Sequence, residues 1–363
     1  MAKRGGAKRR KSFFFRFLVT LIILGFVAFL FCADKGLTPV EAAQYLLGQV
    51  DLPELPDMPR LPELPHLSQI DGLDIFGTPK PEASPSPAPT ASPTPGVYTG
   101  EILQKSGMHA YILDVGQGSC AFLRSPGGYT MLVDTGESSS APVVEAFLQA
   151  QGVERLDVVV ASHPHSDHIG SMAKIIQNYE IGAFYMPDEP YTTALYEAMI
   201  STLEKEHVQT IAAYGGKDAT IPWDPLVSVN LLSPIKGVKY KELNNVSVTL
   251  RIAYDDTSIL LPGDAEAFAE ETMLAKLPRS AFPSSVLVLG HHGSADSTTD
   301  AFLQAVDPSL AIVSAGAGND FGHPSGETLE KLSRRGIPLY RTDENGTIHL
   351  LLNGKKVQVE TER

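Results

Sequence analysis

The stretch that decides the fold is Ser162-His163-Pro164-His165-Ser166-Asp167-His168-Ile169-Gly170, and it directly follows an apolar run at residues 156–161. The run predicts a strand, and in the extended residues after it His163 and His165 point to the same side, so both can bind one metal ion. A helical pattern begins at residue 169, and the turn into that helix would carry Asp167 and His168 toward a second ion. A dinuclear metal centre is therefore predicted, and the alternative is a histidine-rich surface loop.

The surrounding sequence alternates between strand and helix patterns. Strands are predicted at residues 110–115, 120–124, 129–133, 156–161, 227–232, 246–252, 258–261, 286–289 and 310–313. Helices are predicted at residues 142–150, 169–178, 193–206, 266–277 and 328–335. This order indicates two sheets packed face to face and covered by helices. Because the candidate ligands are scattered along the whole region, we expect one α/β domain at residues 98–363.

Six motifs in chain order resemble those of a known family. They are Leu113-Asp114-Val115-Gly116-Gln117-Gly118, Leu132-Val133-Asp134-Thr135-Gly136, the stretch 162–170, Leu261-Pro262-Gly263-Asp264-Ala265-Glu266, Leu289-Gly290-His291-His292-Gly293-Ser294 and Phe321-Gly322-His323-Pro324. The His-x-His-x-Asp-His string is the signature of the metallo-β-lactamase superfamily, and residues 105–363 most resemble the soluble domain of ComEC-type DNA-internalisation competence proteins. The resemblance implies an αββα four-layer sandwich with two divalent metal ions, Zn²⁺ or Mn²⁺, in a cleft at one edge of the sheets.

The resemblance also assigns metal ligands outside the first stretch. Asp264 matches the carboxylate that bridges the two ions, and Gly263 before it permits a tight turn; the alternative is a turn or helix-capping aspartate. His291 matches the last histidine ligand of the superfamily. His292 is the alternative for that ligand and is otherwise a candidate catalytic residue, and the sequence does not separate the two.

Further residues are expected to support the centre or the reaction. By resemblance, Asp134 orients the ligand loop through hydrogen bonds. Asp114 and Gln117 are expected to hold loops beside the cleft, although a purely structural role is at least as plausible. His323 is a candidate for contacting a substrate phosphate or protonating a leaving group, with an ordinary exposed loop histidine as the alternative. Asp167, His292 and His323 form the candidate catalytic set.

The sequence departs from the superfamily pattern at two places. Many members supply a third histidine to the first ion from the interval between the first string and the bridging aspartate, where this chain has only His207. His207 follows a predicted helix and is interpreted as a helix-terminal, solvent-facing residue, so the first site is expected to be completed by water. Cys120 stands after Gly118 and Ser119 near a position that is commonly acidic, and it is interpreted as strand packing.

The N-terminal residues predict a membrane anchor. Residues 1–12 are basic, and residues 13–32 form an apolar run whose single charge is Arg16. Twenty residues at helical rise can span a bilayer, and the positive flank predicts a cytoplasmic N-terminus with everything after the span outside the cell. The alternative, a cleaved signal peptide, is disfavoured because no small-x-small cleavage site follows the run.

Residues 33–97 predict a spacer. Of the 27 prolines in the chain, 13 lie between residues 36 and 97, and neither helix nor sheet tolerates that density of proline. The alternation of Pro with Ser, Ala and Thr at residues 78–95 is typical of an extended, semi-rigid stalk.

The net charge argues against one class of function, and the positions of the cysteines argue against a disulfide. The formal net charge is −13, and all seven Lys and Arg among residues 1–16 lie in or beside the predicted anchor, so the remaining chain is more acidic still. An acidic body argues against a broad nucleic-acid footprint that relies on basic residues. The two cysteines, Cys32 and Cys120, lie in different predicted regions and are not expected to pair.

The resemblance implies metal-dependent hydrolysis, with a phosphodiesterase or nuclease activity that uses a hydroxide bridging the two ions and with DNA as a candidate substrate. Competence permeases have many membrane spans whereas one is predicted here, so a role in DNA uptake does not follow. Two alternatives stay open. The chain could hydrolyse an envelope ester of the phosphocholine type or a lactam or lactone, or it could be a non-catalytic surface module. No protein partner is predicted.

Overall fold

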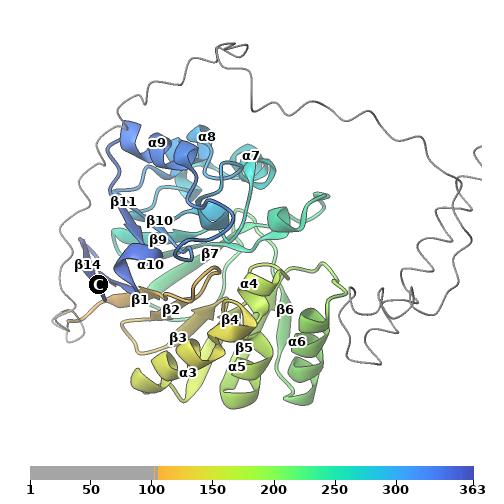
Figure 1. Cartoon of the computed structure of the whole chain (residues 1–363). Helices are drawn as coiled ribbons and strands as arrows, with labels where there is room; N and C mark the ends of the chain where they lie inside the picture. The colour runs from red at the N-terminus through yellow and green to blue at the C-terminus, as the bar shows by residue number, and fades with distance from the viewer. Residues whose placement is uncertain (1–101, 103–104) are drawn as a thin grey trace, which may run out of the picture. The chain divides into compact units, whose positions relative to one another are not determined.

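The computed structural model describes residue 102 and residues 105–363. These residues form two β-sheets that pack face to face, with helices on both outer faces (Figure 1). The predicted basic tail at residues 1–12, membrane span at 13–32 and linker at 33–97 lie outside the described residues. Within the described part of the chain, no helix combines the length and the apolar character needed to cross a bilayer.

The first sheet has eight strands. They are β1 Met108–Ile112, β2 Ala121–Arg124, β3 Thr130–Val133, β4 Arg155–Val160, β5 Glu180–Met186, β6 Thr210–Ala212, β13 Ile348–Leu352 and β14 Val357–Thr361. Their spatial order is β14-β13-β1-β2-β3-β4-β5-β6. The strands from β3 to β6 run parallel, and the others pair antiparallel. β13 and β14 therefore complete the sheet that β1 and β2 begin.

The second sheet has six strands. They are β7 Val227–Ser233, β8 Thr249–Tyr254, β9 Thr257–Leu261, β10 Val286–Val288, β11 Leu310–Val313 and β12 Leu339–Arg341. Their spatial order is β12-β11-β10-β9-β8-β7. The pairs β7–β8 and β8–β9 are antiparallel, and β9 to β12 run parallel. Both sheets are mixed, so each has a parallel half whose strands end at a common edge.

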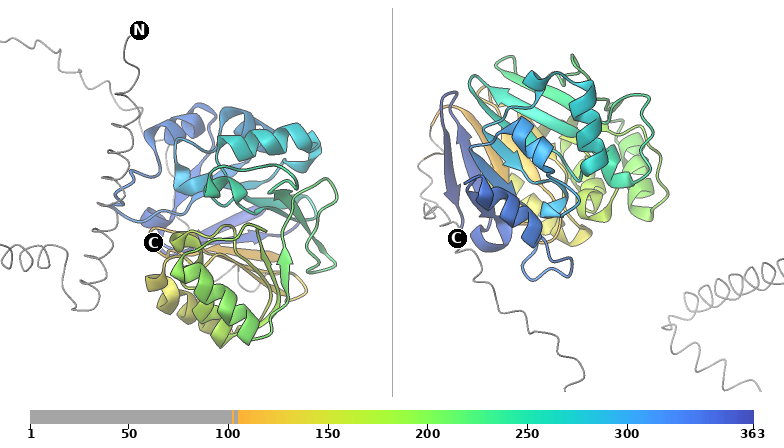
Figure 2. Two further views of the ribbon diagram at one scale, coloured as in Figure 1. Left: turned by 90° about the vertical axis from the view of Figure 1, so that its right-hand side faces the viewer. Right: turned by 90° about the horizontal axis from the view of Figure 1, so that it is seen from above.

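Helices form the two outer layers (Figures 1 and 2). Those packed on the first sheet are α3 Ala141–Ala150, α4 Ser166–Ile169, α5 Met172–Asn178 and α6 Ala194–Lys205. Those packed on the second sheet are α7 Ala267–Lys276, α8 Asp300–Val306 and α9 Gly326–Arg334, and the short α10 Thr342–Asn345 follows β12. The predicted α/β sandwich of two sheets between helical layers is confirmed.

Alternation along the strands produces these layers. In β1, Met108, Ala110 and Ile112 pack in the core between the sheets, whereas Tyr111 packs among the side chains under the helices. Leu250 of β8 meets the same inter-sheet core from the other side. Side chains two residues apart share a face of a strand, so each strand buries one apolar row against the other sheet and one against helices.

The prediction of one helix at residues 169–178 is wrong in one respect, because the structure has two helices in this region, α4 and α5. α4 ends at Ile169 and α5 begins at Met172. The hydroxyl of Ser138 donates a hydrogen bond to the Gly170 carbonyl at 3.1 Å, and the hydroxyl of Ser171 donates one to the Glu137 carbonyl at 2.6 Å. The break lets α4 act as a separate turn that presents Asp167 and His168.

The parallel halves of the two sheets end on the same side of the sandwich. β4 ends at Val160, shortly before Ser162, and β9 ends at Leu261, shortly before Asp264. The two sheets are tied here because the amide of Val248 donates a hydrogen bond to the Ser162 carbonyl at 2.8 Å. The hydroxyl of Ser314, which follows β11, donates one to the Gly118 carbonyl at 2.7 Å. Loops that are far apart in the sequence therefore meet at one edge.

Candidate metal centre

The extended residues after β4 place two imidazoles together. His163 is fully buried, and its Nε2 lies 3.0 Å from Nδ1 of the half-buried His165. The two side chains point to the same side because they are two residues apart in extended chain. This arrangement matches the pair that the sequence predicts for one metal ion.

A second group of ligand atoms lies beside the first. One donor atom from each of Asp167, His168, Asp264 and His292 lies within 4.8 Å of the other three. Nε2 of His292 is 3.1 Å from Oδ2 of Asp167, and Nε2 of His168 is 4.0 Å from the same oxygen. Three different loops thus contribute to one small volume.

Asp264 belongs to both groups. Its Oδ1 lies 3.1 Å from Nε2 of His168, and its Oδ2 lies 3.7 Å from Nε2 of His163 and 3.7 Å from Nε2 of His292. Gly263 has a φ of +59°, a left-handed turn that presents the aspartate after β9, and the Asp264 amide donates to the Ser247 hydroxyl at 3.0 Å. We refer to the six residues His163, His165, Asp167, His168, Asp264 and His292 as the histidine cluster.

Asp134 fixes the orientation of His168. Its Oδ2 accepts hydrogen bonds from Nδ1 of His168 and from the Ser162 hydroxyl, each at 2.7 Å, and its Oδ1 accepts one from the Ser162 amide at 2.7 Å. Asp134 is itself buried at the end of β3. A carboxylate on Nδ1 leaves Nε2 of His168 free to face the histidine cluster, which agrees with the supporting role predicted for Asp134.

The structure separates the adjacent histidines His291 and His292. Both have left-handed backbone, with φ of 49° and 52°, so their side chains diverge. His292 is buried and has its Nδ1 2.9 Å from the Ser314 carbonyl, which aims its Nε2 at Asp167 and Asp264. His291 is 24% exposed, and its Nε2 lies 3.9 Å from Oδ2 of Asp264. His292 therefore joins the second group, and His291 lies at its outer side.

The donor set fits divalent cations. Among the described residues, the buried atoms Nε2 of His168 and Oδ1 of Asp264 face each other at 3.1 Å, and neither makes a well-aligned hydrogen bond. Such atoms are costly in a protein interior unless something else satisfies them. Imidazole nitrogens together with carboxylate oxygens are ligands that Zn²⁺ and Mn²⁺ accept. Bound cations would satisfy both atoms at once.

The shifted pKa values in the cluster favour metal binding at His163, His165 and Asp264 and oppose it at His168. Burial lowers the pKa of His163 to well below its usual range and also lowers the pKa of His165, so both imidazoles are neutral, the form that binds metal. Burial would raise the pKa of Asp264, but the charges of His168 and His292 outweigh it and hold that pKa well below its usual range. Burial likewise opposes protonation of His168, yet Asp264 and Asp134 raise its pKa well above the usual value. A cation would displace that proton.

Three other predicted residues lie around the cluster or away from it. The His323 ring is 5.5 Å from the His291 ring and 6.4 Å from the His292 ring, so His323 borders the cluster. Asp114 accepts a hydrogen bond from Arg363 at 2.8 Å and holds the Gly116 amide at 3.3 Å, which is a structural role at the C-terminus of the chain. His207 is exposed just beyond α6 and makes no contact with the cluster in the described structure.

Gln117 and Cys120 agree with the structural interpretations given for them. Oε1 of Gln117 accepts a hydrogen bond from the Gly316 amide at 3.0 Å, which ties the loop after β1 to the loop after β11. Cys120 is buried, and burial followed by the charge of Asp134 raises the pKa of its thiol far above the usual value. It therefore stays a thiol and packs in the core.

The sequence reasoning missed a polar group next to His291. The side-chain amides of Asn244 and Asn245 donate to the Glu266 carboxylate at 2.8 Å each, and the Asn244 amide nitrogen lies 3.4 Å from Nε2 of His291. Oδ1 of Asn244 is buried without a hydrogen-bond partner among the described residues. An Asn-Asn pair ahead of a strand reads as an ordinary turn, so the sequence carried little signal for it.

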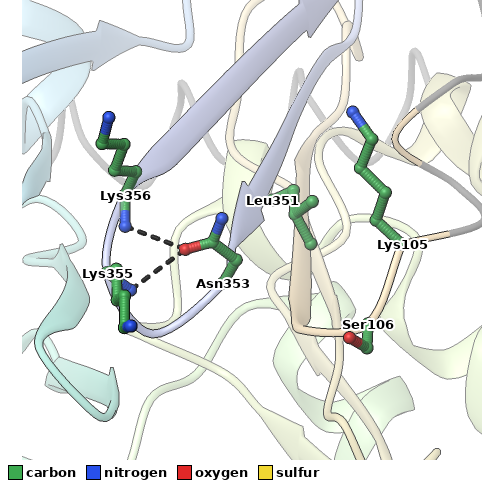
Figure 3. Close-up of a pocket in the computed structure, with 6 residues that line it drawn as sticks. All are labelled: Lys105, Ser106, Leu351, Asn353, Lys355 and Lys356. Carbon is green, nitrogen blue, oxygen red and sulfur yellow. Dashed lines mark hydrogen bonds between the residues drawn. The ribbon is translucent and has the colours of Figure 1, made fainter.

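A wide cavity of about 580 Å³ is lined by none of the residues of the histidine cluster, and Figure 3 shows its lining. It is lined by Lys105, Ser106, Leu351, Asn353, Lys355 and Lys356. Oδ1 of Asn353 accepts hydrogen bonds from the amides of Lys355 and Lys356 at 3.0 and 2.9 Å, which shapes the turn between β13 and β14. The lining holds no histidine or carboxylate, so this cavity lacks the side chains that bind Zn²⁺ or Mn²⁺.

Comparison with known proteins shows the family of the chain. Residues 113–317 match the Metallo-beta-lactamase superfamily. The chain is 30% identical over 254 residues to ComE operon protein 3 of Bacillus subtilis, covering 65% of this chain and 32% of the relative. It is 29% identical over 264 residues to Competence protein ComA of Neisseria gonorrhoeae, covering 72% and 35%. The chain thus spans about a third of the length of these curated relatives.

A solved structure similar to this chain is CmlA, a diiron beta-hydroxylase from Streptomyces venezuelae. It shares 14% identity at a TM-score of 0.45, covering 68% of this chain and 54% of CmlA. Similarity at this level supports no inference about the reaction.

Proposed function

The chain belongs to the metallo-beta-lactamase superfamily, and from this membership we propose that its histidine cluster holds two divalent ions, Zn²⁺ or Mn²⁺, and hydrolyses phosphodiesters, with DNA as a candidate substrate. The similarity to Competence protein ComA, together with the resemblance to ComEC-type DNA-internalisation proteins, supports a nucleic-acid substrate over a lactam. Because the chain covers only about a third of those relatives, a role in DNA uptake is not part of the proposal.

The single observation that carries the proposal is the position of Asp264. Its two oxygens face imidazoles of both groups, with His168 on Oδ1 and His163 on Oδ2. His163, His165 and Asp264 would hold one ion. Asp167, His168, His292 and Asp264 would hold the other.

Each part of the proposed site has a task. Two ions supply an activated water at neutral pH and neutralise the negative charge that develops on phosphate. Asp134 keeps Nε2 of His168 directed at the cluster. His323 borders His291 and His292, where its ring would contact a phosphate oxygen of the substrate.

The test is a substrate panel on the full chain loaded with Mn²⁺ or Zn²⁺. We expect hydrolysis of bis(p-nitrophenyl) phosphate and DNA, and we expect EDTA or the variant Asp264→Asn to abolish it. The matched control is Asp255→Asn, in the turn between β8 and β9 and therefore at the other end of β9 from Asp264. A metal-loaded protein that leaves both phosphodiesters intact, or that turns over a phosphocholine ester or a β-lactam faster, would refute the proposal.

We also propose that residues 13–32 anchor the protein in the cell membrane and that residues 33–97 hold the domain outside the cell. The support is the apolar run after a basic flank and the proline-rich composition that follows it. Protease treatment of intact cells tests this arrangement. We expect release of the domain, and a domain protected until the cells are lysed contradicts it.

A further inference from the structure

Phe321 exposes an aromatic ring to solvent beside the histidine cluster. Five large apolar side chains are exposed in the described part of the chain, and Phe321, at 69%, is the most exposed of them. It lies on the loop between β11 and α9, two residues before His323. A single exposed apolar side chain is ordinary on a protein surface, and what distinguishes Phe321 is the stacking of its ring on His323 beside the histidine cluster.

Three rings form a row from Phe321 to the cluster. The Phe321 and His323 rings stack with centroids 5.8 Å apart and an interplanar angle of 27°. The His323 and His292 rings are 6.4 Å apart at 22°. The rings are nearly parallel, so the outermost one continues a stack that ends at a proposed metal ligand.

The loop that carries Phe321 is held in place by hydrogen bonds. Asn319 accepts a hydrogen bond from the His323 amide at 3.0 Å and donates to the carbonyls of His323 and Gly316 at 2.7 and 2.9 Å. The Ser325 amide donates to the Gly293 carbonyl at 2.9 Å, next to the histidine pair. Because both ends of the loop are tied down, the position of the ring relative to the cluster is set before a ligand arrives.

We propose that Phe321 is a stacking platform for an unpaired nucleobase next to the phosphodiester that the cluster cleaves, so that the substrate is single-stranded nucleic acid. The proposal rests on the function proposed above. One face of the Phe321 ring meets His323, and the exposed side offers a flat apolar surface of the kind on which bases stack. Stacking needs no positive charge, which suits an acidic chain with a net charge of −13. A base within a duplex already stacks on its neighbours and is not available.

The experiment measures binding and cleavage separately, with the full chain. Fluorescence anisotropy compares a labelled single-stranded oligonucleotide, the same oligonucleotide with abasic sites, and its duplex, with Ca²⁺ present. The proteins are the wild type, Phe321→Ala, Phe321→Trp and Tyr129→Ala. Tyr129 is an exposed aromatic residue just before β3, at the opposite end of that strand from Asp134.

We expect the wild type, Phe321→Trp and Tyr129→Ala to bind the base-bearing single strand roughly tenfold more tightly than the abasic strand, a factor typical of one stacked base. We expect Phe321→Ala to lose this preference while binding the abasic strand as the wild type does. Equal preference in wild type and Phe321→Ala overturns the platform. So does a Phe321→Ala variant that is impaired only on a phosphocholine ester, since that result assigns the ring to a quaternary ammonium group.

Cleavage of the same oligonucleotides with Mn²⁺ distinguishes the two proposals. If the base preference in binding depends on Phe321 but no oligonucleotide is cleaved, the platform is supported and the proposed hydrolysis is refuted. If the oligonucleotides are cleaved at rates that do not depend on the bases or on Phe321, the hydrolysis is supported and the platform is refuted.

Discussion

Oδ2 of Asp134 lies 2.7 Å from Nδ1 of His168, and on the other side of the same ring Nε2 lies 3.1 Å from Oδ1 of Asp264. The ring is thus held between one carboxylate that orients it and another that shares its side of the cluster. Carboxylates behind metal-binding histidines fix the ring and increase its basicity as a ligand. The pair connects β3 to the proposed second metal site.

Asp134→Asn is expected to weaken binding of one of two ions by roughly 10- to 100-fold, the usual effect of removing a group behind a metal-binding histidine. The side-chain amide of the introduced asparagine can hold the His168 ring only in part, and the substitution removes a negative charge near the proposed cation. Calorimetric titration of the metal-free protein with Mn²⁺ measures the effect, with Asp255→Asn as the control. Two unchanged dissociation constants would show that Asp134 serves the fold alone.

Separate replacement of the two adjacent histidines is expected to give different metal contents. His292→Ala removes a buried group whose Nε2 is 3.1 Å from Asp167 and 3.7 Å from Asp264, so we expect the purified variant to hold one ion. His291→Ala removes a partly exposed ring at the outer side of the cluster, so we expect it to retain two. Metal analysis by mass spectrometry measures both, and the reverse pattern would assign the ligand to His291.

Gly118→Ala is expected to disturb the metal site through the backbone. A Cβ at this position would lie 2.5 Å from the carbonyl oxygen of Asp167, a contact that forces the ligand loop to move. Overpacking of this kind costs about 1–3 kcal/mol, so we expect a lower melting temperature and loss of the ion next to Asp167.

Gly116→Ala is the matched control for Gly118→Ala. Gly116 lies in the same loop and also has a positive φ, but a Cβ there meets nothing within 4 Å. It shares backbone strain with the test variant and lacks the contact with Asp167. Equal metal loss in both variants would attribute the effect to strain in the loop.

His349 is expected to make the fold sensitive to acid at a site remote from the metals. It is fully buried in β13, its ring stacks 4.0 Å from that of Tyr111, its Nε2 lies 3.0 Å from Nδ1 of His109, and its Nδ1 lies 4.0 Å from Glu360. Burial, and then the neighbouring His109, lowers the pKa of His349 to about 3. Below its ordinary pKa of about 6.5, the unfolded chain therefore binds a proton that the folded chain does not.

The stability contributed by neutral His349 is complete above about pH 6.5 and falls as the pH decreases toward 3. Each pH unit in this window costs about 1.4 kcal/mol, so the loss between pH 7 and pH 5 is roughly 2 kcal/mol. Urea unfolding in EDTA at the two pH values measures it, and we expect a smaller loss for His349→Gln. Parallel curves for wild type and variant would contradict this explanation.

The sequence predicted most of the architecture because its signals were local. Short β-rich and apolar runs predicted the strands around 110–133, 156–161 and 258–261, and the strand-turn-helix context of residues 156–178 predicted the region around which the cluster forms. Membership in the superfamily is shown by the match over residues 113–317. Proximity of Asp264 to the first string was expected from the resemblance, and the structure places it 3.7 Å from His163.

What the sequence left open depends on tertiary context. The separation of His291 from His292 follows from two consecutive left-handed residues, a conformation that no periodic pattern indicates. β5, β6, β12, β13 and β14 were not predicted, and the place of the last two in the first sheet depends on the pairing of β13 with β1, between residues as distant as Met108 and Leu352. The contact of Asn244 with His291 depends on the order of strands in the second sheet, where β9 lies between β8 and β10. The membrane anchor and the stalk stay predictions.

The return of β13 and β14 to the first sheet has a consequence for how the polypeptide becomes native during synthesis. β1 hydrogen-bonds to β13 through a register that joins Met108 to Leu352 and Ile112 to Ile348. Until the ribosome has released these last strands, β1 presents an open edge to any extended peptide nearby. Pairing across so long a stretch of chain is slow. Folding of the first sheet is therefore expected to wait until β13 and β14 have been synthesised, and deletion of residues 348–363 is expected to yield aggregates in place of a smaller folded domain.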